Sequence, residues 1–280
     1  MKLRSSIVSA CAAAGLAVTL LAPQAAARQD GQGYGQPSSA GAKPTIVLLH
    51  GAWADASGWT EVVKRLQHDG YTVKAPAVPL RSVSGDSKYI ASILKQTPGP
   101  LVVVGHSYGG AVMTNAAYGN PRVKALVYIA AFAPDAGESL ADLVSRPQPN
   151  PIPPLPVQPL AYPKPDGSEG IDLYLDPAQY PSVFLNNRLP RPLANAMAVE
   201  QRPLSNDAFV EKTTKVAWKK IPSWYLVAKN DRAIDPDLQR FMASRARART
   251  VQVNAPHLAM VTNPKPVTAL IERAVHTTAR

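Results

Sequence analysis

Short apolar runs alternate with amphipathic stretches from Thr45 onward. Six runs have the length and composition of strands, at 45–49, 71–78, 101–104, 123–131, 221–228 and 251–253. Residues 59–67 carry apolar side chains at the i, i+3, i+4, i+7 spacing of a helix that buries one face. Residues 87–96 and a segment opening at Gly109 are also expected to be helical. Strands that are apolar on both faces and alternate with helices predict an α/β fold, with a mostly parallel central sheet flanked by helices.

One long segment, about 135–220, interrupts this alternation. Nine prolines fall within residues 147–165. Because proline lacks a backbone donor and is excluded from central strands, this segment cannot belong to the central sheet. We expect a proline-rich cap insertion, and a disordered surface loop is the alternative. The insertion also contains aromatic side chains that disordered linkers seldom have, Tyr162, Tyr174, Tyr180, Phe184 and Phe209.

The composition is that of a globular chain with an excess of proline. Of 280 residues, 46% are apolar and 18% charged, with 28 prolines and 17 glycines. This excludes collagen, a coiled coil and a wholly disordered protein. Fourteen of the 28 prolines lie between Asp135 and Lys220, so the excess belongs to the insertion. Prolines restrict the unfolded chain, and we expect them to make this cap a rather fixed wall.

The N-terminus has the features of a secretory signal peptide. Lys2 and Arg4 precede an uncharged apolar run, and 25–27 is a small-residue cleavage site. We therefore expect residues 1–27 to be removed, 28–44 to be a flexible Gly/Gln/Ser-rich lead-in, and 45–280 to form the domain. The protein is expected to be secreted, periplasmic or extracellular, with no stable membrane anchor. Cys11, the single cysteine, leaves with the peptide.

The chain is basic, with a formal charge of +11 that falls to +9 when Lys2 and Arg4 are removed. The basic residues are scattered and have no aromatic residues interleaved with them. A solvated basic surface explains this pattern, and no nucleic-acid partner is expected. The sequence does not indicate the oligomeric state.

A serine lies in the pattern G-x-S-x-G at 105–109, between the apolar run 101–104 and a helix. A sharp strand-to-helix turn would lift Ser107 above the sheet, with Gly105 and Gly109 permitting the close approach. The Tyr108 N–H would then lie at a helix N-terminus, where it can stabilise an oxyanion. A serine that merely caps a helix is the structural alternative.

A serine nucleophile needs a base, and His257 is the best placed of five histidines. It follows the last apolar run, which would deliver it to the upper edge of the sheet. The other four fit the role less well. His106 points away from its serine neighbour, His50 precedes the first loop, His68 ends an exposed helix, and His276 lies near the C-terminus.

The acid that orients this imidazole is expected to be Asp231, which follows the run 221–228. Asp135 is the alternative. Asp235 and Asp237 open a predicted helix, and we expect them to cap it or to balance its dipole. The order serine, aspartate, histidine is that of the α/β hydrolases.

A second oxyanion donor is expected in the loop after the run 45–49. Gly51 allows a tight turn, so the Ala52 N–H can point at the same spot as that of Tyr108. Four further residues are candidates for the pocket, His50, Trp53, His106 and Leu258.

The motifs at 48–53, 104–110, 130–135, 231–241 and 257–260 together resemble the α/β-hydrolase superfamily. The chain is similar to the branch that holds methylesterases, hydroxynitrile lyases and their bacterial relatives. This resemblance implies Ser107, Asp231 and His257 as the triad, Ala52 and Tyr108 as oxyanion donors, and a cap between the strands at 123–131 and 221–228. The lyases have a lysine after the catalytic histidine. Here that residue is Leu258, which argues against lyase chemistry.

The sequence thus predicts a secreted serine hydrolase that needs no cofactor or metal and acts on small-molecule carboxylic esters through an acyl-enzyme on Ser107. A lactonase, amidase or perhydrolase on the same triad is one alternative. A secreted ligand-binding protein without useful turnover is another. The natural substrate is not indicated.

Overall fold

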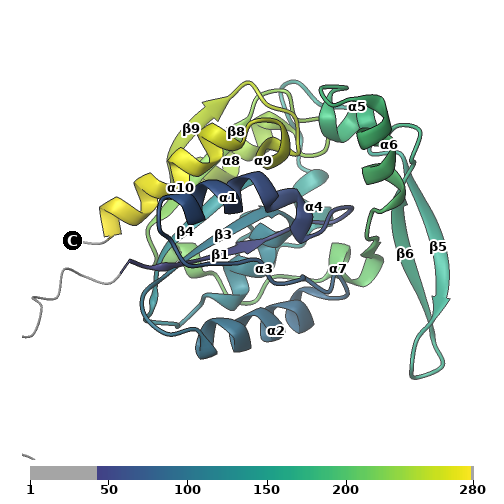
Figure 1. Ribbon diagram of the computed structural model, residues 1–280. Helices are drawn as coiled ribbons and strands as arrows, with labels where there is room; N and C mark the ends of the chain where they lie inside the picture. Colours follow the sequence, from purple (N-terminus) through teal and green to yellow (C-terminus); the bar gives the residue numbers. More distant parts are fainter. Residues whose placement is uncertain (1–42, 279–280) are drawn as a thin grey trace, which may run out of the picture. The chain divides into compact units, whose positions relative to one another are not determined.

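A six-stranded parallel sheet in the order β2-β1-β3-β4-β8-β9 forms the centre of the computed structural model, which describes residues 43–278 (Figure 1). The predicted signal peptide and most of the lead-in lie outside the described residues. All residues of β1, β3 and β8 are buried, as expected of strands covered on both faces. The strands are β1 (Thr45–Leu49), β2 (Val73–Lys74), β3 (Leu101–Ser107), β4 (Val123–Ala131), β8 (Ser223–Ala228) and β9 (Arg249–Val253).

Helices cover both faces of this sheet (Figure 1). On one face α10 packs across β3, β4 and β8 and against α1. On the other face α3 packs on β3 and β4 and against α2, which lies below it in Figure 1. The α/β architecture predicted from the alternating pattern is confirmed. The helices are α1 (Thr60–His68), α2 (Val83–Gln96), α3 (Tyr108–Ala116), α8 (Pro236–Arg245), α9 (Ala259–Thr262) and α10 (Pro264–Thr278), with a 3-10 turn, η1 (Ala56–Trp59), before α1.

Three predicted elements differ from their predicted bounds by three residues or more. The extended run at 71–78 contributes only Val73–Lys74, which pair with Ile46 and Val47 of β1. The helix predicted at 87–96 begins at Val83, because the Ser82 side chain caps it. The strand predicted at 101–104 continues to Ser107, so that the nucleophile candidate is its last residue.

Between β4 and β8 the chain forms the cap, which contains more regular structure than the sequence predicted. Its strands β5, β6 and β7 form a separate antiparallel sheet, and the β5–β6 hairpin projects to the right of the central sheet in Figure 1. The prolines of β5 are tolerated because β5 is an edge strand. The elements are α4 (Leu140–Val144), β5 (Val157–Pro163), β6 (Glu169–Leu175), α5 (Tyr180–Leu185), α6 (Arg191–Val199), β7 (Leu204–Ser205), α7 (Asn206–Val210) and the 3-10 turn η2 (Ala217–Lys219).

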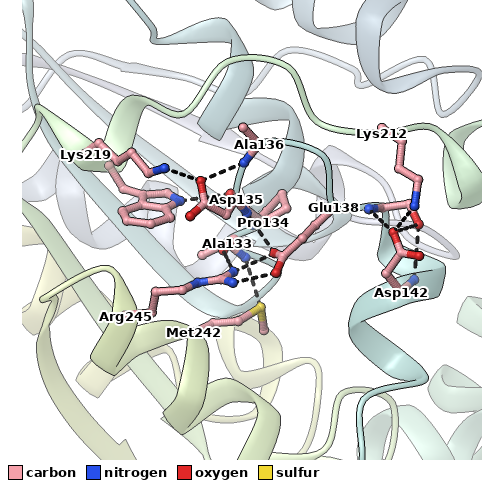
Figure 2. A network of polar contacts seen from close by, with 12 residues as sticks. Ala133, Pro134, Asp135, Ala136, Glu138, Asp142, Lys212, Lys219, Met242 and Arg245 are labelled. Carbon is pink, nitrogen blue, oxygen red and sulfur yellow. Dashed lines mark hydrogen bonds and ion pairs between the residues drawn. The ribbon is translucent and has the colours of Figure 1, made fainter.

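The chain is clamped to α8 where it leaves β4 for the cap (Figure 2). Both guanidinium Nη atoms of Arg245 donate to the Glu138 carboxylate, at 2.6 and 2.7 Å, and one also donates to the Ala133 carbonyl at 3.0 Å. Partial burial raises the pKa of Glu138, but the bonds and charge of Arg245 outweigh it, and the pKa falls below its usual value. This bidentate pair fixes the first residues of the cap.

Two further ion pairs join the start of the cap to its end (Figure 2). Lys219, in η2, contacts the Asp135 carboxylate, and Lys212 contacts the Asp142 carboxylate. Asp142 also completes a capping box with Ser139 at the start of α4. The two ends of the insertion are therefore held together beside the sheet.

We expect Glu138→Gln to lower the free energy of unfolding by about 1–2 kcal/mol, because it removes the charge from a partly buried bidentate pair. Urea unfolding measures this change. Glu61→Gln is the control, since Glu61 pairs with Lys64 on the exposed face of α1 and should show no measurable effect. Equal effects of the two substitutions would contradict the clamp.

Candidate active site

Ser107 lies at the junction of β3 and α3 in a strained backbone conformation, with φ 52° and ψ −124°. The glycines of the motif make this turn possible. A Cβ on Gly105 would lie 2.7 Å from the Gly109 carbonyl oxygen, and one on Gly109 would lie 2.6 Å from the Leu49 carbonyl oxygen. The turn therefore needs both glycines because three pieces of backbone meet there.

The loop after β1 presses against the nucleophile candidate. A Cβ added to Gly51 would lie 2.5 Å from the Ser107 Cβ and 3.1 Å from its Oγ. Only glycine lets the backbone of this loop come so close, and so places the neighbouring Ala52 beside Ser107. Ala52, Ser107 and Tyr108 all line the same cavity.

His257, the predicted base, is fully buried and oriented by Asp231. Its Nδ1 is 2.8 Å from Asp231 Oδ2, so the carboxylate accepts this hydrogen bond. Its Nε2 has no hydrogen-bond partner among residues 43–278. The imidazole lies between the rings of His106 and Phe184, with centroids 4.6 and 4.7 Å away. The ring is thus fixed, with one nitrogen left to accept a proton.

Asp231 is a buried carboxylate whose two oxygens accept four hydrogen bonds. The backbone N–H groups of Ala233 and Ile234 donate to Oδ1 at 2.7 and 3.0 Å. The Gln239 side chain and His257 donate to Oδ2, each at 2.8 Å. These donors hold the carboxylate in place, and the bond from His257 fixes the tautomer with its proton on Nδ1.

Gln239 was missed by the sequence reasoning. It is fully buried on α8, and besides Asp231 it binds the Ile234 carbonyl at 2.8 Å and the Ala228 N–H at 3.0 Å. A glutamine inside a predicted amphipathic helix gives no signal of this role, since its partners become visible only when the helix is packed on the sheet.

The other aspartates considered for the acid have structural roles. Asp135 forms an ion pair with Lys219 and accepts the Ala136 N–H. No hydrogen bond between described residues joins it to His257. Asp235 is the N-cap of α8, as expected, and its Oδ1 accepts the Asp237 N–H at 2.7 Å. Asp237 forms an i,i+3 ion pair with Arg240.

The cap holds the loop that carries Ala52. Trp53, in the left-handed region with φ 54°, donates its backbone N–H to the Arg202 carbonyl at 2.8 Å and its indole N–H to the Leu173 carbonyl at 2.7 Å. The Tyr180 hydroxyl donates to the Trp53 carbonyl at 3.0 Å. Three hydrogen bonds from the cap therefore determine the position of the predicted oxyanion donor Ala52.

The second predicted donor, the Tyr108 N–H, is at the first position of α3, where amides have no acceptor within the helix. The Tyr108 hydroxyl donates to buried Asp86 at 2.9 Å. Burial raises the pKa of Asp86 above its usual value, although bonds from Tyr108 and the backbone oppose this. Asp86, another residue that the sequence did not reveal, anchors α3 to α2.

His50 and His106 do not line the cavity, contrary to the prediction; both are fully buried behind it. His50 Nε2 accepts the Val78 N–H at 2.9 Å, while its Nδ1 donates to the Gly51 carbonyl at 2.9 Å. His106 Nε2 donates to the His257 carbonyl at 3.0 Å. These imidazoles hold the backbone of the loop that carries Ala52 and of the predicted base His257.

Both supporting histidines are held neutral. Burial lowers the pKa of His106 well below its ordinary value, and the nearby His257 lowers it further. Burial also lowers the pKa of His50, and this outweighs the bond to the Gly51 carbonyl. Protonation of His50 would break its bond from the Val78 N–H.

The cavity beside Ser107 and His257 has a volume of about 630 Å³ and is mainly apolar. Of the four further pocket candidates, only Trp53 lines it. Leu258 does not, because the chain turns into α9 there and the Leu258 N–H donates to the Phe184 carbonyl. Most of the lining comes from the cap and α8, including Phe132, Leu140, Val144, Pro151, Ile152, Pro153, Pro154, Leu155, Phe209, Ile234 and Leu238.

No group of three or more His, Cys, Asp or Glu side chains within 43–278 is arranged to hold a metal ion. No helix in that range is both long enough and apolar enough to span a bilayer.

The sequence pattern of the alpha/beta hydrolase family matches residues 46–270, and the chain belongs to this family. Carbendazim hydrolyzing esterase from Nocardioides sp. (strain SG-4G) is 32% identical over 114 residues, 36% of this chain and 47% of that protein, so the match spans about half of that esterase.

Two solved structures share the fold. Polyneuridine aldehyde esterase superposes with a TM-score of 0.70 at 19% identity, covering 82% of this chain and 98% of the other. The methylesterase MES16 from Arabidopsis superposes with a TM-score of 0.66 at 18% identity, covering 84% and 99%. These likenesses show that the chain shares the fold of both proteins.

We expect the stability of the protein to decrease as the pH falls from 7 to 5. Below about pH 6.5 the histidines of the unfolded chain bind protons that folded His50 and His106 exclude, so acid favours unfolding. Each contributes up to about 1.4 kcal/mol per pH unit. His106→Gln, whose amide can still donate to the His257 carbonyl, should reduce the slope of unfolding free energy against pH, measured by urea unfolding. An unchanged slope would contradict the exclusion of protons by His106.

Proposed function

We propose that this α/β hydrolase is a serine hydrolase that cleaves small-molecule carboxylic esters through an acyl-enzyme on Ser107. One observation carries the proposal. His257 uses Nδ1 to bind Asp231 and leaves Nε2 without a partner among the described residues, in the cavity that Ser107 also lines. A neutral imidazole in this tautomer is a base for a serine hydroxyl.

In the first half-reaction Ser107 Oγ attacks the ester carbonyl carbon while His257 Nε2 takes the hydroxyl proton. The tetrahedral intermediate collapses when the C–O bond to the alcohol breaks, and His257 returns the proton to the leaving alcohol. In the second half-reaction water attacks the acyl-enzyme, again losing its proton to His257. The acid is released and Ser107 recovers its proton.

The negative charge that develops on the carbonyl oxygen of the ester is stabilised by hydrogen-bond donors that are already in place. The N–H groups of Ala52 and Tyr108 are suited to this role, since both residues line the cavity beside Ser107 and Tyr108 begins α3. Asp231 stabilises the imidazolium that forms on His257, at a site where burial strengthens the attraction.

The names of the similar proteins support ester chemistry. One is called a carbendazim hydrolyzing esterase, and the two solved structures are named polyneuridine aldehyde esterase and methylesterase MES16. Hydrolysis of lactones and amides, and formation of peracids, would use the same serine nucleophile. A substrate panel with one ester, one lactone and one amide ranks the three hydrolytic activities. The signal-like segment 1–27 supports export of this enzyme to the periplasm or the medium.

We expect Ser107→Ala to reduce hydrolysis of p-nitrophenyl acetate by about 10⁴-fold or to background, because it removes the hydroxyl nucleophile that lines the cavity with His257. Release of p-nitrophenolate measures this, and unfolding by heat checks that the fold persists. Ser92→Ala, on the exposed face of α2, is the matched control and should retain full activity.

Covalent labelling by a fluorophosphonate separates the proposal from a binding protein without turnover. The wild type should be labelled at Ser107 and Ser107→Ala should not. Labelling that persists in the variant, or turnover at the wild-type rate, would refute the mechanism.

A further inference from the structure

The proline-rich segment 146–157 forms one wall of the cavity that Ser107 and His257 line. The wall contributes only one side chain with a formal charge, Arg146, which is exposed at the rim with its guanidinium 3.8 Å from the Phe241 ring centroid. The remaining wall residues that line the cavity are Pro147, Gln148, Pro151, Ile152, Pro153, Pro154, Leu155 and Val157.

The wall is tied to α8 by few bonds. The Ile152 N–H donates to Asp235 Oδ2 at 3.2 Å, and the Asn150 side chain donates to Asp237 Oδ2 at 3.2 Å. The Asn150 bond is exposed, whereas Asp235 is buried and itself lines the cavity. The Asp235 tie is therefore the one that water competes with least.

Asp235 performs two tasks with its two oxygens. Oδ1 caps α8 by accepting the Asp237 N–H at 2.7 Å, and Oδ2 holds the wall at Ile152. The same helix carries Gln239, which binds the Asp231 carboxylate. The wall and the triad acid are thus fixed to one rigid element, which sets their separation.

We propose that Asp235 is a specificity-determining residue: by tying the wall to α8 it sets the size of a cavity that receives the bulky, uncharged apolar group of an ester. This inference rests on the proposed function. Both Asp235 oxygens accept backbone N–H groups and Arg146 is exposed at the rim, while the remaining lining is mainly apolar and suits an uncharged apolar group. A cavity of about 630 Å³ is of the size that holds such a substrate.

A series of p-nitrophenyl esters from acetate to hexadecanoate tests the size limit. For the wild type, kcat/KM should rise about fourfold per methylene while the chain remains inside the cavity, and should fall once the chain meets the wall. The steepness of the decrease in kcat/KM with further chain length measures how firmly the wall is held.

Asp235→Asn separates the two tasks of this residue. Asparagine is a good N-cap, so its Oδ1 can still accept the Asp237 N–H, but its amide nitrogen cannot accept the Ile152 N–H. We expect the fall beyond the preferred length to become at least about threefold shallower, mainly through KM. Pro153→Gly with Pro154→Gly loosens the same wall without touching α8 and should change the profile in the same direction. Asp166→Asn, in the turn of the β5–β6 hairpin, is the matched control.

A binding measurement distinguishes the failure of this inference from that of the proposed function. Non-hydrolysable n-alkyl methyl ketones of increasing length are titrated into Ser107→Ala, with and without Asp235→Asn, by calorimetry. Affinity that peaks at one length and broadens with Asp235→Asn supports the wall even if no ester is hydrolysed, which would refute only the hydrolase. Profiles that superimpose with and without Asp235→Asn would overturn the assignment of Asp235.

Discussion

Ser107 holds a backbone conformation that an L-residue adopts only where its surroundings impose it, at a cost of about 1–3 kcal/mol. The surroundings here are backbone rather than side chains: Gly51, Gly105 and Gly109 bring the loop after β1, the end of β3 and the start of α3 within contact of one another. The parallel pairing of β3 with β1 and β4 keeps these segments in register. The sheet therefore supplies the energy that keeps the serine hydroxyl raised above its edge.

The proposed base, His257, is likewise held in place by the groups around it. His257 is held by a carboxylate on one side, a neutral histidine behind it and an aromatic ring against its face. A buried charge such as Asp231 is stable only when its lone pairs are satisfied, and four donors do this. Two of these donors lie in the loop between β8 and α8 and a third lies on α8, so the position of Asp231 against His257 depends on the packing of α8 on the sheet.

Sequence reasoning predicted most of the central fold because buried parallel strands carry their own signature. Runs such as 123–131 are apolar on both faces, and that run is β4 with the same bounds. The strand-to-helix turn at Ser107 was predicted from the G-x-S-x-G pattern at the end of an apolar run. Asp231 and His257 were chosen because each follows a later apolar run. The supporting groups could not be predicted: His50, Asp86 and Gln239 act through partners 8 to 28 residues away, and nothing in their local sequence marks them. In the cap, the prolines of β5 excluded only a central strand, so the edge strand that forms there was not predicted.

The contacts between the cap and Trp53 bear on whether the cap opens as a lid or stays in place over the cavity. A lid that opened as a unit would break the bonds from Trp53 to Arg202 and Leu173 and the bond from Tyr180, and would release the loop that carries Ala52. Oxyanion donors stabilise charge because they are fixed before the reaction, so a cap that repeatedly released this loop would weaken the feature it covers. The ion pairs of Asp135 and Asp142 hold the two ends of the insertion together as well. These contacts favour a cap that is a permanent part of the site, with variation in substrate size accommodated along the wall that α8 holds.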